Sequence, residues 1–236
     1  MTPCIACIIP TYNEGPRISH VLDVAAQYYN FSEIIVVDDG STDQTSSILL
    51  NYKNVQVIKH TSNQGKAAAL AAGVEKSTSE IVVFLDADLI GLRKENLDDL
   101  LAPVLKEKCM SVSLLQNAVG ISHLLGIDAW SGQRALWKKD LDIFEKKSQK
   151  AGYAIELIFN DIAIKKGLPI YSIPWTNVRF ISKGEKNEKK NGTVADIRMF
   201  ITAAATFGLY KAFWQIFLFF PLLAFKKKIL PSHFRN

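Results

Sequence analysis

Two aspartates separated by one residue, Asp86 and Asp88, are the side chains of this sequence best placed to hold a metal ion. They follow the apolar run 81–85, whose continuous, partly β-branched character is typical of a buried parallel strand. Side chains two residues apart on an extended segment point to the same side, so the two carboxylates can converge. Converging carboxylates repel each other unless a cation lies between them. A hard divalent ion with water and phosphate oxygens as further ligands fits; the simpler alternative is a solvated strand end that caps a helix.

The elements around these aspartates predict an α/β fold. Apolar runs predict strands at 4–9, 34–37, 55–58 and 81–85, with helical patterns near 16–29, 44–52 and 66–76. This alternation implies right-handed crossovers and a mostly parallel sheet, in which ligands bind beyond the carboxyl ends of the strands. Polar clusters follow three of these strand ends, at residues 11–14, 38–41 and 86–88.

The second half of the chain is less regular. It contains a predicted helix at 97–106, a strand at 110–115, a helix at 153–166 ended by Gly167 and a strand at 169–173. Segment 177–192, rich in Lys, Glu, Asn and Gly, is expected to be a mobile loop. The expected organisation is one α/β domain over residues 1–195 and an apolar, basic helical tail over residues 196–236.

The tail is strongly apolar and aromatic from residue 199 to residue 225. Lys211 and Pro221 interrupt it, so it lacks the uncharged stretch of roughly 20 residues that spans a bilayer. Lysines follow at 226–228, and apolar surface beside lysines favours a helix lying in the membrane interface. The alternative is a helix packed on the domain, or on a second subunit of a homodimer.

Composition narrows the choice of partners. The formal net charge of +5 and the isoelectric point of about 9.0 suit anionic partners such as nucleotides and phospholipid surfaces. Nucleic acid is not expected, because no basic and aromatic binding motif is present. Cys4, Cys7 and Cys109 lack the partners of a zinc site and are expected to be buried thiols. Since no signal peptide is visible, a cytoplasmic location is expected.

Four segments, taken together in this order, carry a resemblance that none carries alone. They are Ile8-Ile9-Pro10-Thr11-Tyr12-Asn13-Glu14, Val36-Val37-Asp38-Asp39-Gly40-Ser41-Thr42-Asp43, Asn63-Gln64-Gly65-Lys66-Ala67-Ala68-Ala69-Leu70 and Asp86-Ala87-Asp88. This set resembles the nucleotide-sugar-binding half of a family 2 glycosyltransferase with the Rossmann-like GT-A fold, over roughly residues 4–180. It is similar to the polyprenyl-phosphate sugar synthases of that family.

For the nucleoside of the donor, the resemblance implies two groups of residues. An acidic pair, Asp38 and Asp39, matches the position where one carboxylate accepts a hydrogen bond from the base. The segment that contacts base and ribose is matched by Pro10, Thr11, Tyr12 and Glu14.

For the diphosphate, the resemblance implies a divalent metal. Gly65 and Lys66 match the element beside the base and diphosphate. Asp86, Ala87 and Asp88 match the D-x-D motif that holds Mg²⁺ or Mn²⁺, with Asp88 as the favoured direct ligand. Breaking a sugar–phosphate bond leaves a nucleoside diphosphate with extra negative charge, which a bridging cation stabilises.

Other cations could add to the positive field around the diphosphate, namely Lys66, Arg134, Arg179 and Lys183, although each could equally be a solvated surface residue. Some relatives complete the metal site with a histidine from the late loop, and residues 176–192 contain none. The metal is therefore expected to rest on Asp88, donor oxygens and water.

The acceptor side is predicted from two later segments. Residues 131–136 resemble the acceptor-side segment of such enzymes, with Ser131, Gly132 and Gln133 as binding residues and Arg134 as a catalytic cation. Residues 152–156, at the start of a predicted helix, resemble the segment that carries an acidic acceptor-side residue; Glu156 could also simply favour the helix dipole. The candidates for a catalytic base are Glu156, Asp161 and Asp128.

The chemistry of the acceptor separates two hypotheses. A sugar hydroxyl is a poor nucleophile that needs a positioned base, whereas a phosphate with a second pKa of about 6 is already anionic at neutral pH. The basic loop and lysine-flanked tail favour a polyprenyl phosphate at the inner face of the cell membrane. The alternative is a soluble or polysaccharide acceptor such as phosphoglycerate. With no covalent nucleophile evident, we expect inverting transfer from a UDP- or GDP-linked sugar.

Two other classes fit less well. Phospho-receiver signalling modules also combine an acidic pair with a later aspartate, but their pair follows the first strand, whereas strand 4–9 precedes the pair here. Nucleotidyltransferases with a similar sheet usually begin with a glycine-rich phosphate loop, which is absent after Ile9.

Overall fold

The structure, a computed structural model, describes residues 2–118, 120–141 and 155–181. In this part of the chain, seven strands form one sheet in the order β3-β2-β1-β4-β7-β6-β8. Their bounds are β1 Ile5–Thr11, β2 Glu33–Asp38, β3 Gln56–Lys59, β4 Ile81–Phe84, β6 Met110–Leu115, β7 Arg134–Trp137 and β8 Ile170–Trp175. Only β7 runs antiparallel to its neighbours, β4 and β6, so the predicted mostly parallel α/β fold is confirmed.

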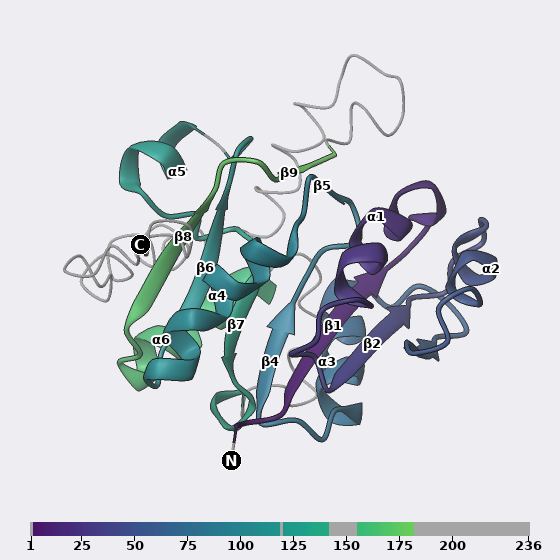
Figure 1. The fold of residues 1–236 in the computed structure, drawn as a ribbon, viewed down its shortest axis with the longest axis horizontal. Coiled ribbons are helices and arrows are strands. Elements are labelled where there is room, and N and C mark those ends of the chain that lie inside the picture. Colours follow the sequence, from purple (N-terminus) through teal and green to yellow (C-terminus); the bar gives the residue numbers. More distant parts are fainter. Residues whose placement is uncertain (1, 119, 142–154, 182–236) are drawn as a thin grey trace.

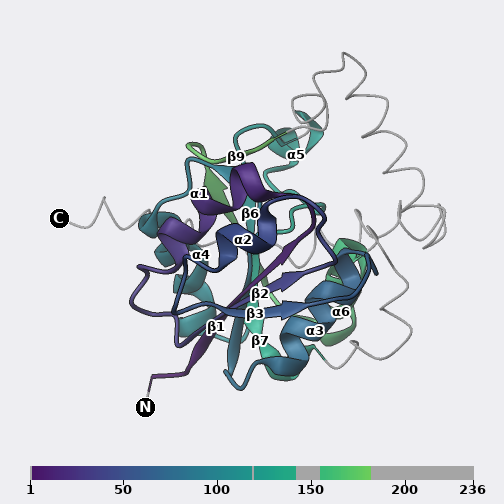
Figure 2. The ribbon, with the colours of Figure 1, turned by 90° about the vertical axis from the view of Figure 1, so that its right-hand side faces the viewer.

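Helices cover both faces of the sheet (Figures 1 and 2). The helices are α1 Gly15–Ala25, α2 Thr45–Leu49, α3 Lys66–Lys76, α4 Lys94–Lys106, α5 Gly120–Leu125 and α6 Ile155–Lys166, with a 3-10 turn at Lys138–Asp140. The helices α1 and α4 lie on one face, and α3 and α6 on the other.

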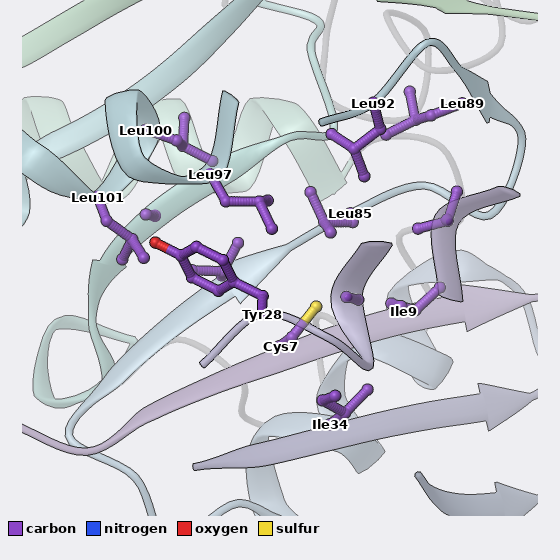
Figure 3. Packing of buried hydrophobic residues seen from close by; sticks show 14 of the residues in the cluster. Cys7, Ile9, Tyr28, Ile34, Leu85, Leu89, Leu92, Leu97, Leu100 and Leu101 are labelled. Atoms are coloured by element: carbon purple, nitrogen blue, oxygen red, sulfur yellow. The ribbon is translucent and has the colours of Figure 1, made fainter. Parts of the chain in front are cut away.

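Strands β1 and β4 are buried on both faces because their residues alternate between two apolar clusters, whereas the edge strand β3 is largely exposed. On β1, Cys7 and Ile9 pack with α1 and α4 (Figure 3), whereas Ile8 packs with α3 and α6. This double burial explains why β1 and β4 are continuous apolar runs rather than alternating ones. It also leaves the carboxyl ends of the strands as the place where polar side chains gather.

A second, two-stranded sheet lies directly after the D-x-D segment. Strand β5 (Leu89–Ile90) pairs antiparallel with β9 (Arg179–Phe180). The amide of Ile181 donates to the carbonyl of Asp88 at 3.3 Å. Asn117 holds the backbone of Phe180 through both its side-chain nitrogen and its oxygen, at 2.9 and 3.2 Å. The segment around Asp88 is thus fixed by residues that lie far along the chain.

Most predicted elements are confirmed, and the differences have local causes. Helix 66–76 and strand 110–115 have the predicted bounds, and Gly167, with φ of +59°, ends α6. The helix predicted at 97–106 begins earlier, at Lys94, because Asn96 accepts a hydrogen bond from the amide of Arg93 and caps it. The antiparallel strand β7 was missed; it is four residues long and begins with an arginine.

The predicted tail and the end of the predicted loop, from residue 182 onward, lie outside the described residues. The proposed division at residue 195 therefore stays a prediction. Within the described ranges, no helix has the length and apolar character needed to cross a membrane.

Candidate active site

A lysine held between two carboxylates forms the centre of the site. Lys66 Nζ lies 2.7 Å from Asp86 Oδ1 and 2.8 Å from Glu156 Oε1. The three residues come from the start of α3, the end of β4 and the start of α6, and their side chains are 22%, 24% and 8% exposed. Burial alone would lower the pKa of the Lys66 ammonium, but the two carboxylates outweigh it and raise the pKa above its ordinary value. The cluster therefore keeps a cation between the predicted donor and acceptor sides.

The predicted acceptor segment lies directly against Asp86. The Gln133 side chain donates to Asp86 Oδ2 at 2.6 Å, and its own oxygen accepts from the hydroxyl of Ser131 at 2.9 Å. A Cβ on Gly132 would lie 2.5 Å from Asp86 Oδ2 and 2.8 Å from Lys66 Nζ, distances that real Cβ atoms do not show. Position 132 therefore requires glycine if the segment is to approach Asp86 this closely.

Arg134 is completely buried, and its guanidinium binds the backbone of the residues just before Gly132. Its guanidinium donates to the carbonyls of Ser131 and Ala129, each at 2.8 Å, and to Asn160 Oδ1 at 2.7 Å. It also lies 5.5 Å from the ring centre of Phe159. Burial lowers its pKa to about 10, although nearby carboxylates oppose the shift, so it stays charged at neutral pH. The predicted catalytic role remains a prediction; the geometry favours positioning of residues 129–131.

Asn160 was missed by the sequence analysis. It is buried, and besides accepting from Arg134 it donates to the carbonyl of Ala129 at 3.0 Å. Its spacing of four residues from Glu156 places both on one face of α6, which was the available signal.

The three candidate bases have different surroundings. Glu156 lies in the central cluster. Asp161 pairs with Lys165 one turn further along α6, at 2.7 Å. Asp128 is buried and accepts from the amide of Trp130 at 3.0 Å; burial raises its pKa, and the Trp130 amide and Arg134 only partly oppose this. Of the three acids, the structure brings Glu156 into contact with Lys66.

The acidic pair after β2 is buried and fixes the neighbouring turns. Asp38 accepts from the amide of Ser41 at 2.9 Å and the hydroxyl of Ser46 at 2.6 Å. Asp39 accepts from the amides of Gln64 and Gly65, at 2.9 and 2.7 Å, directly before α3. Asp39 thereby ties the end of β2 to the turn that presents Lys66.

The segment after β1 lies next to this pair. The amide of Asp39 donates to the carbonyl of Thr11 at 2.8 Å. The Thr11 hydroxyl is buried without a hydrogen-bond partner among the described residues. Tyr12 is 43% exposed, and Glu14 pairs with Arg17. Pro10, at the end of β1, pairs in register with Val37 of β2. The structure thus gathers the predicted nucleoside-binding residues at one end of β1 and β2.

The D-x-D segment has the donor chemistry for a divalent ion but not a complete ligand set. Both oxygens of Asp86 are engaged, by Lys66 and Gln133, so Asp88 is the better candidate for a direct ligand. The intervening Ala87 is buried. Over the described residues, no group of three or more His, Cys, Asp or Glu side chains could hold a metal. These carboxylates fit an oxygen-liganded ion such as Mg²⁺ or Mn²⁺ that takes its remaining ligands from phosphate and water.

Of the two predicted cations that come last in the sequence, Arg179 and Lys183, the structure describes only Arg179. Arg179 lies on β9 opposite Ile90, two residues after the D-x-D segment, and its role at the diphosphate stays a prediction. Lys183 lies outside the described residues.

Comparison with known sequences identifies the domain that carries most of this site. Residues 6–118 match the sequence model of the family described as Glycosyl transferase family 2. The chain contains a family 2 glycosyl transferase domain. The matched region contains Lys66, Asp86 and Asp88, whereas Gln133 and Glu156 lie beyond it.

Curated relatives of this family 2 domain include dolichyl-phosphate beta-glucosyltransferases. The one from Mus musculus is 37% identical over 102 residues, which cover 37% of this chain and 32% of the relative. One from Trichomonas vaginalis is 37% identical over 94 residues, or 34% of this chain and 28% of the relative. The matched part of the chain thus spans about a third of the length of these relatives.

Solved structures extend the likeness to the acceptor side. Glucosyl-3-phosphoglycerate synthase from Mycobacterium tuberculosis, in complex with Mn²⁺, UDP and glucosyl-3-phosphoglycerate, superimposes with a TM-score of 0.66 at 20% identity. The superposition covers 86% of this chain and 80% of the synthase. At this identity the likeness shows the fold alone.

Proposed function

We propose that this protein transfers a sugar from a UDP- or GDP-linked donor to a polyprenyl phosphate, with inversion at the anomeric carbon and with Mg²⁺ or Mn²⁺. The observation that carries the proposal is the Asp86–Lys66–Glu156 cluster, in which two residues of the family 2 domain contact an acid that lies beyond it. It joins the D-x-D segment to the helix that carries the predicted acceptor-side acid. The names of the curated relatives support a lipid phosphate as the acceptor.

The proposal assigns a role to each residue around the donor diphosphate. When bound, the metal stabilises the charge that develops on the leaving diphosphate. Asp88 holds the metal, and Lys66 adds a second positive charge near the same phosphate oxygens. Asp86, bonded to Lys66 and Gln133, positions the lysine and the acceptor segment rather than binding the metal itself. The nucleoside lies against Asp39, the end of β1 and the turn before α3.

The state of Glu156 favours a phosphate acceptor. A general base must accept a proton from the nucleophile, yet Glu156 is ion-paired with Lys66 at 2.8 Å. A hydroxyl acceptor would require Glu156 to leave this pair. A lipid phosphate is already anionic near neutral pH, so it needs cations and orientation instead. It attacks the anomeric carbon directly, and the sugar–phosphate bond to the nucleoside diphosphate breaks on the opposite face.

Phosphoglycerate is the second candidate acceptor. It is supported by the resemblance in fold to glucosyl-3-phosphoglycerate synthase over 86% of this chain. For this acceptor, a hydroxyl is the nucleophile and Glu156 would act as the base after leaving Lys66.

We further propose that the protein works at the inner face of the cell membrane, peripherally attached. The basic loop and the apolar tail predicted from the sequence support this location, and the tail could instead join two subunits. Deletion of residues 199–236 is expected to release the protein from the membrane fraction. Complete recovery of the intact protein in the soluble fraction would contradict the membrane proposal.

The deciding experiment is a transfer assay on the intact chain. UDP- and GDP-linked hexoses are supplied with Mn²⁺ and either a polyprenyl phosphate in vesicles or phosphoglycerate in solution. We expect a lipid-linked sugar of inverted anomeric configuration. Transfer to phosphoglycerate alone would establish the second candidate, and a product with retained configuration would exclude single displacement.

A further inference from the structure

His60 makes a contact with the acidic pair that the proposed function has not used. It follows β3 directly, and its amide donates to the carbonyl of Asp38 at 2.9 Å. Its ring nitrogen Nδ1 lies 2.7 Å from Asp39 Oδ1. The two side chains are only 13% and 4% exposed. The backbone of His60 is therefore fixed on the sheet, which places its ring against the carboxylate.

The hydrogen bonds of Asp39 are distributed unevenly between its two oxygens. Oδ1 accepts from His60 Nδ1 and from the amide of Gln64. Oδ2 accepts from the amide of Gly65, its one partner among the described residues. A carboxylate offers about four acceptor positions, so the open position lies on Oδ2. Since Asp39 accepts from both amides, we assign it as the acceptor for His60 as well, with the proton on Nδ1.

We propose that His60 is a positioning residue for the nucleotide base of the donor. By occupying Oδ1, it holds the Asp39 carboxylate in the rotamer that leaves Oδ2 available to a ring N–H of the base. A side chain that binds a ligand keeps its productive rotamer when a neighbouring residue holds it by a hydrogen bond. The inference rests on the proposed function, since it takes Asp39 as the acceptor for the base.

This arrangement specifies a chemical class of base. A carboxylate oxygen accepts from the ring N–H of uracil or guanine. Cytosine and adenine have no ring N–H at the corresponding position. The orientation fixed by His60 should therefore matter for nucleotides that carry this N–H and be immaterial for analogues in which it is methylated.

Three variants separate positioning from simple structural support. His60→Leu removes the N–H donor and keeps an apolar side chain of moderate size. His60→Asn restores an N–H donor close to the position of Nδ1. His20→Leu, at an exposed histidine of α1, is the matched control.

The test is calorimetric titration of the full chain with Mn²⁺ and either UDP and 3-methyluridine 5′-diphosphate or GDP and 1-methylguanosine 5′-diphosphate. We expect His60→Leu to weaken binding of the unmethylated nucleotide about five- to tenfold, with the methylated analogue unaffected. His60→Asn should recover most of the affinity, and His20→Leu should bind like the wild type. Thermal melting checks the fold of each variant.

Several outcomes would overturn the inference, and they are distinguishable from failure of the proposed function. Equal weakening of both nucleotides by His60→Leu, or no recovery in His60→Asn, would show structural support only. A wild-type protein that binds methylated and unmethylated nucleotides equally would remove Asp39 as the base acceptor. A wild-type protein that binds neither UDP nor GDP with Mn²⁺ would overturn the proposed function itself, and the inference with it.

Discussion

The donor half and the acceptor half of the site differ in the partners that hold their buried charged side chains. The donor half comprises the ends of β1, β2 and β4 with the start of α3, and the acceptor half comprises residues 128–137 with α6. In the donor half, Asp39 accepts from two backbone amides of the turn before α3, besides its contact with His60. In the acceptor half, Arg134 donates to the side chain of Asn160, besides two backbone carbonyls. Lys66 joins the halves by contacting one carboxylate from each.

This difference explains why one half is easier to recognise than the other. A backbone amide is present whatever residue occupies the position, so a carboxylate that binds amides needs only its own identity to be specified. A side-chain pair needs both partners, and these lie far apart in sequence. Gln133 is 47 residues from Asp86, and Arg134 is 26 residues from Asn160. The donor half can therefore be recognised from the carboxylates alone, whereas the acceptor half depends on side chains at both ends of a pair.

The largest expected effect tests the donor half. Asp88→Ala removes the favoured metal ligand, so transfer should fall by about 100-fold or more, because a bound metal is worth several kcal/mol to the transition state. Calorimetric binding of nucleotide should lose its dependence on Mn²⁺, while the melting temperature stays unchanged. Wild-type affinity for the nucleotide with Mn²⁺ would rule out the metal role of Asp88.

The next effect tests the junction between the halves. Gly132→Ala places a Cβ against both oxygens of Asp86 and against Lys66 Nζ, so either these side chains or the acceptor segment must shift and the contact between them changes. We expect a loss of stability of about 1–3 kcal/mol, as for other overpacked sites, and a fall in kcat/KM. Urea denaturation and transfer kinetics measure the two effects. Wild-type kinetics in this variant would show that the close approach of the two halves is not needed for transfer.

A pair of variants on α6 tests the side-chain network of the acceptor half. Asn160→Leu leaves a donor of buried Arg134 without its partner and removes one of the two hydrogen bonds to the carbonyl of Ala129, which should cost about 1–3 kcal/mol of stability. The neighbouring Asp161→Asn breaks only the pair with Lys165, whose side chain is 62% exposed, and should cost at most about 0.5 kcal/mol. Denaturation curves for both variants provide the comparison.

The transfer rates of Asn160→Leu and Asp161→Asn also test which acid is the catalytic base. If Asp161→Asn abolished transfer and left the fold intact, the base would have to be Asp161 rather than Glu156.

The smallest expected effect is a change in stability at Glu33, which lies outside both halves of the site. Burial raises the pKa of Glu33, but hydrogen bonds from Thr78 and Ser77 together outweigh it and lower the pKa below its ordinary value. A lowered pKa contributes stability above the unfolded value of about 4.3, and this contribution is lost as the pH falls. Because Glu33 is partly exposed to solvent, Glu33→Gln should cost well under 1 kcal/mol at pH 6 and less at pH 3.5. Denaturation at both pH values measures this; a cost that grows on acidification would contradict the assignment.

The fold was predictable where hydrophobic periodicity is strong. The parallel strands and α3 follow from apolar runs and the residues that end them. Strand β7 did not, because four residues beginning with buried Arg134 have no strand pattern of their own. Its antiparallel place between β4 and β6 depends on tertiary contacts that a single sequence does not display.

The candidate site was predictable to a similar degree. Asp86, Lys66 and Glu156 were each singled out, but their convergence on one ammonium depends on how α3, β4 and α6 meet. His60 and Asn160 were missed, since neither belongs to a recognisable motif. Their importance comes from the buried charges they contact, Asp39 and Arg134, and burial is a property of the folded chain.

The two-stranded sheet of β5 and β9 links ligand binding at Asp88 to the stability of the backbone around Ile181. Asp88 receives a hydrogen bond from Ile181, and Phe180 is held by Asn117. A ligand that binds only while Asp88 is in this position stabilises the pairing of β5 with β9 by mass action. Ligand binding at Asp88 should therefore stabilise the backbone at Ile181, where the chain leaves β9, through the direct hydrogen bond between these two residues. Amide exchange at Ile181 would report it.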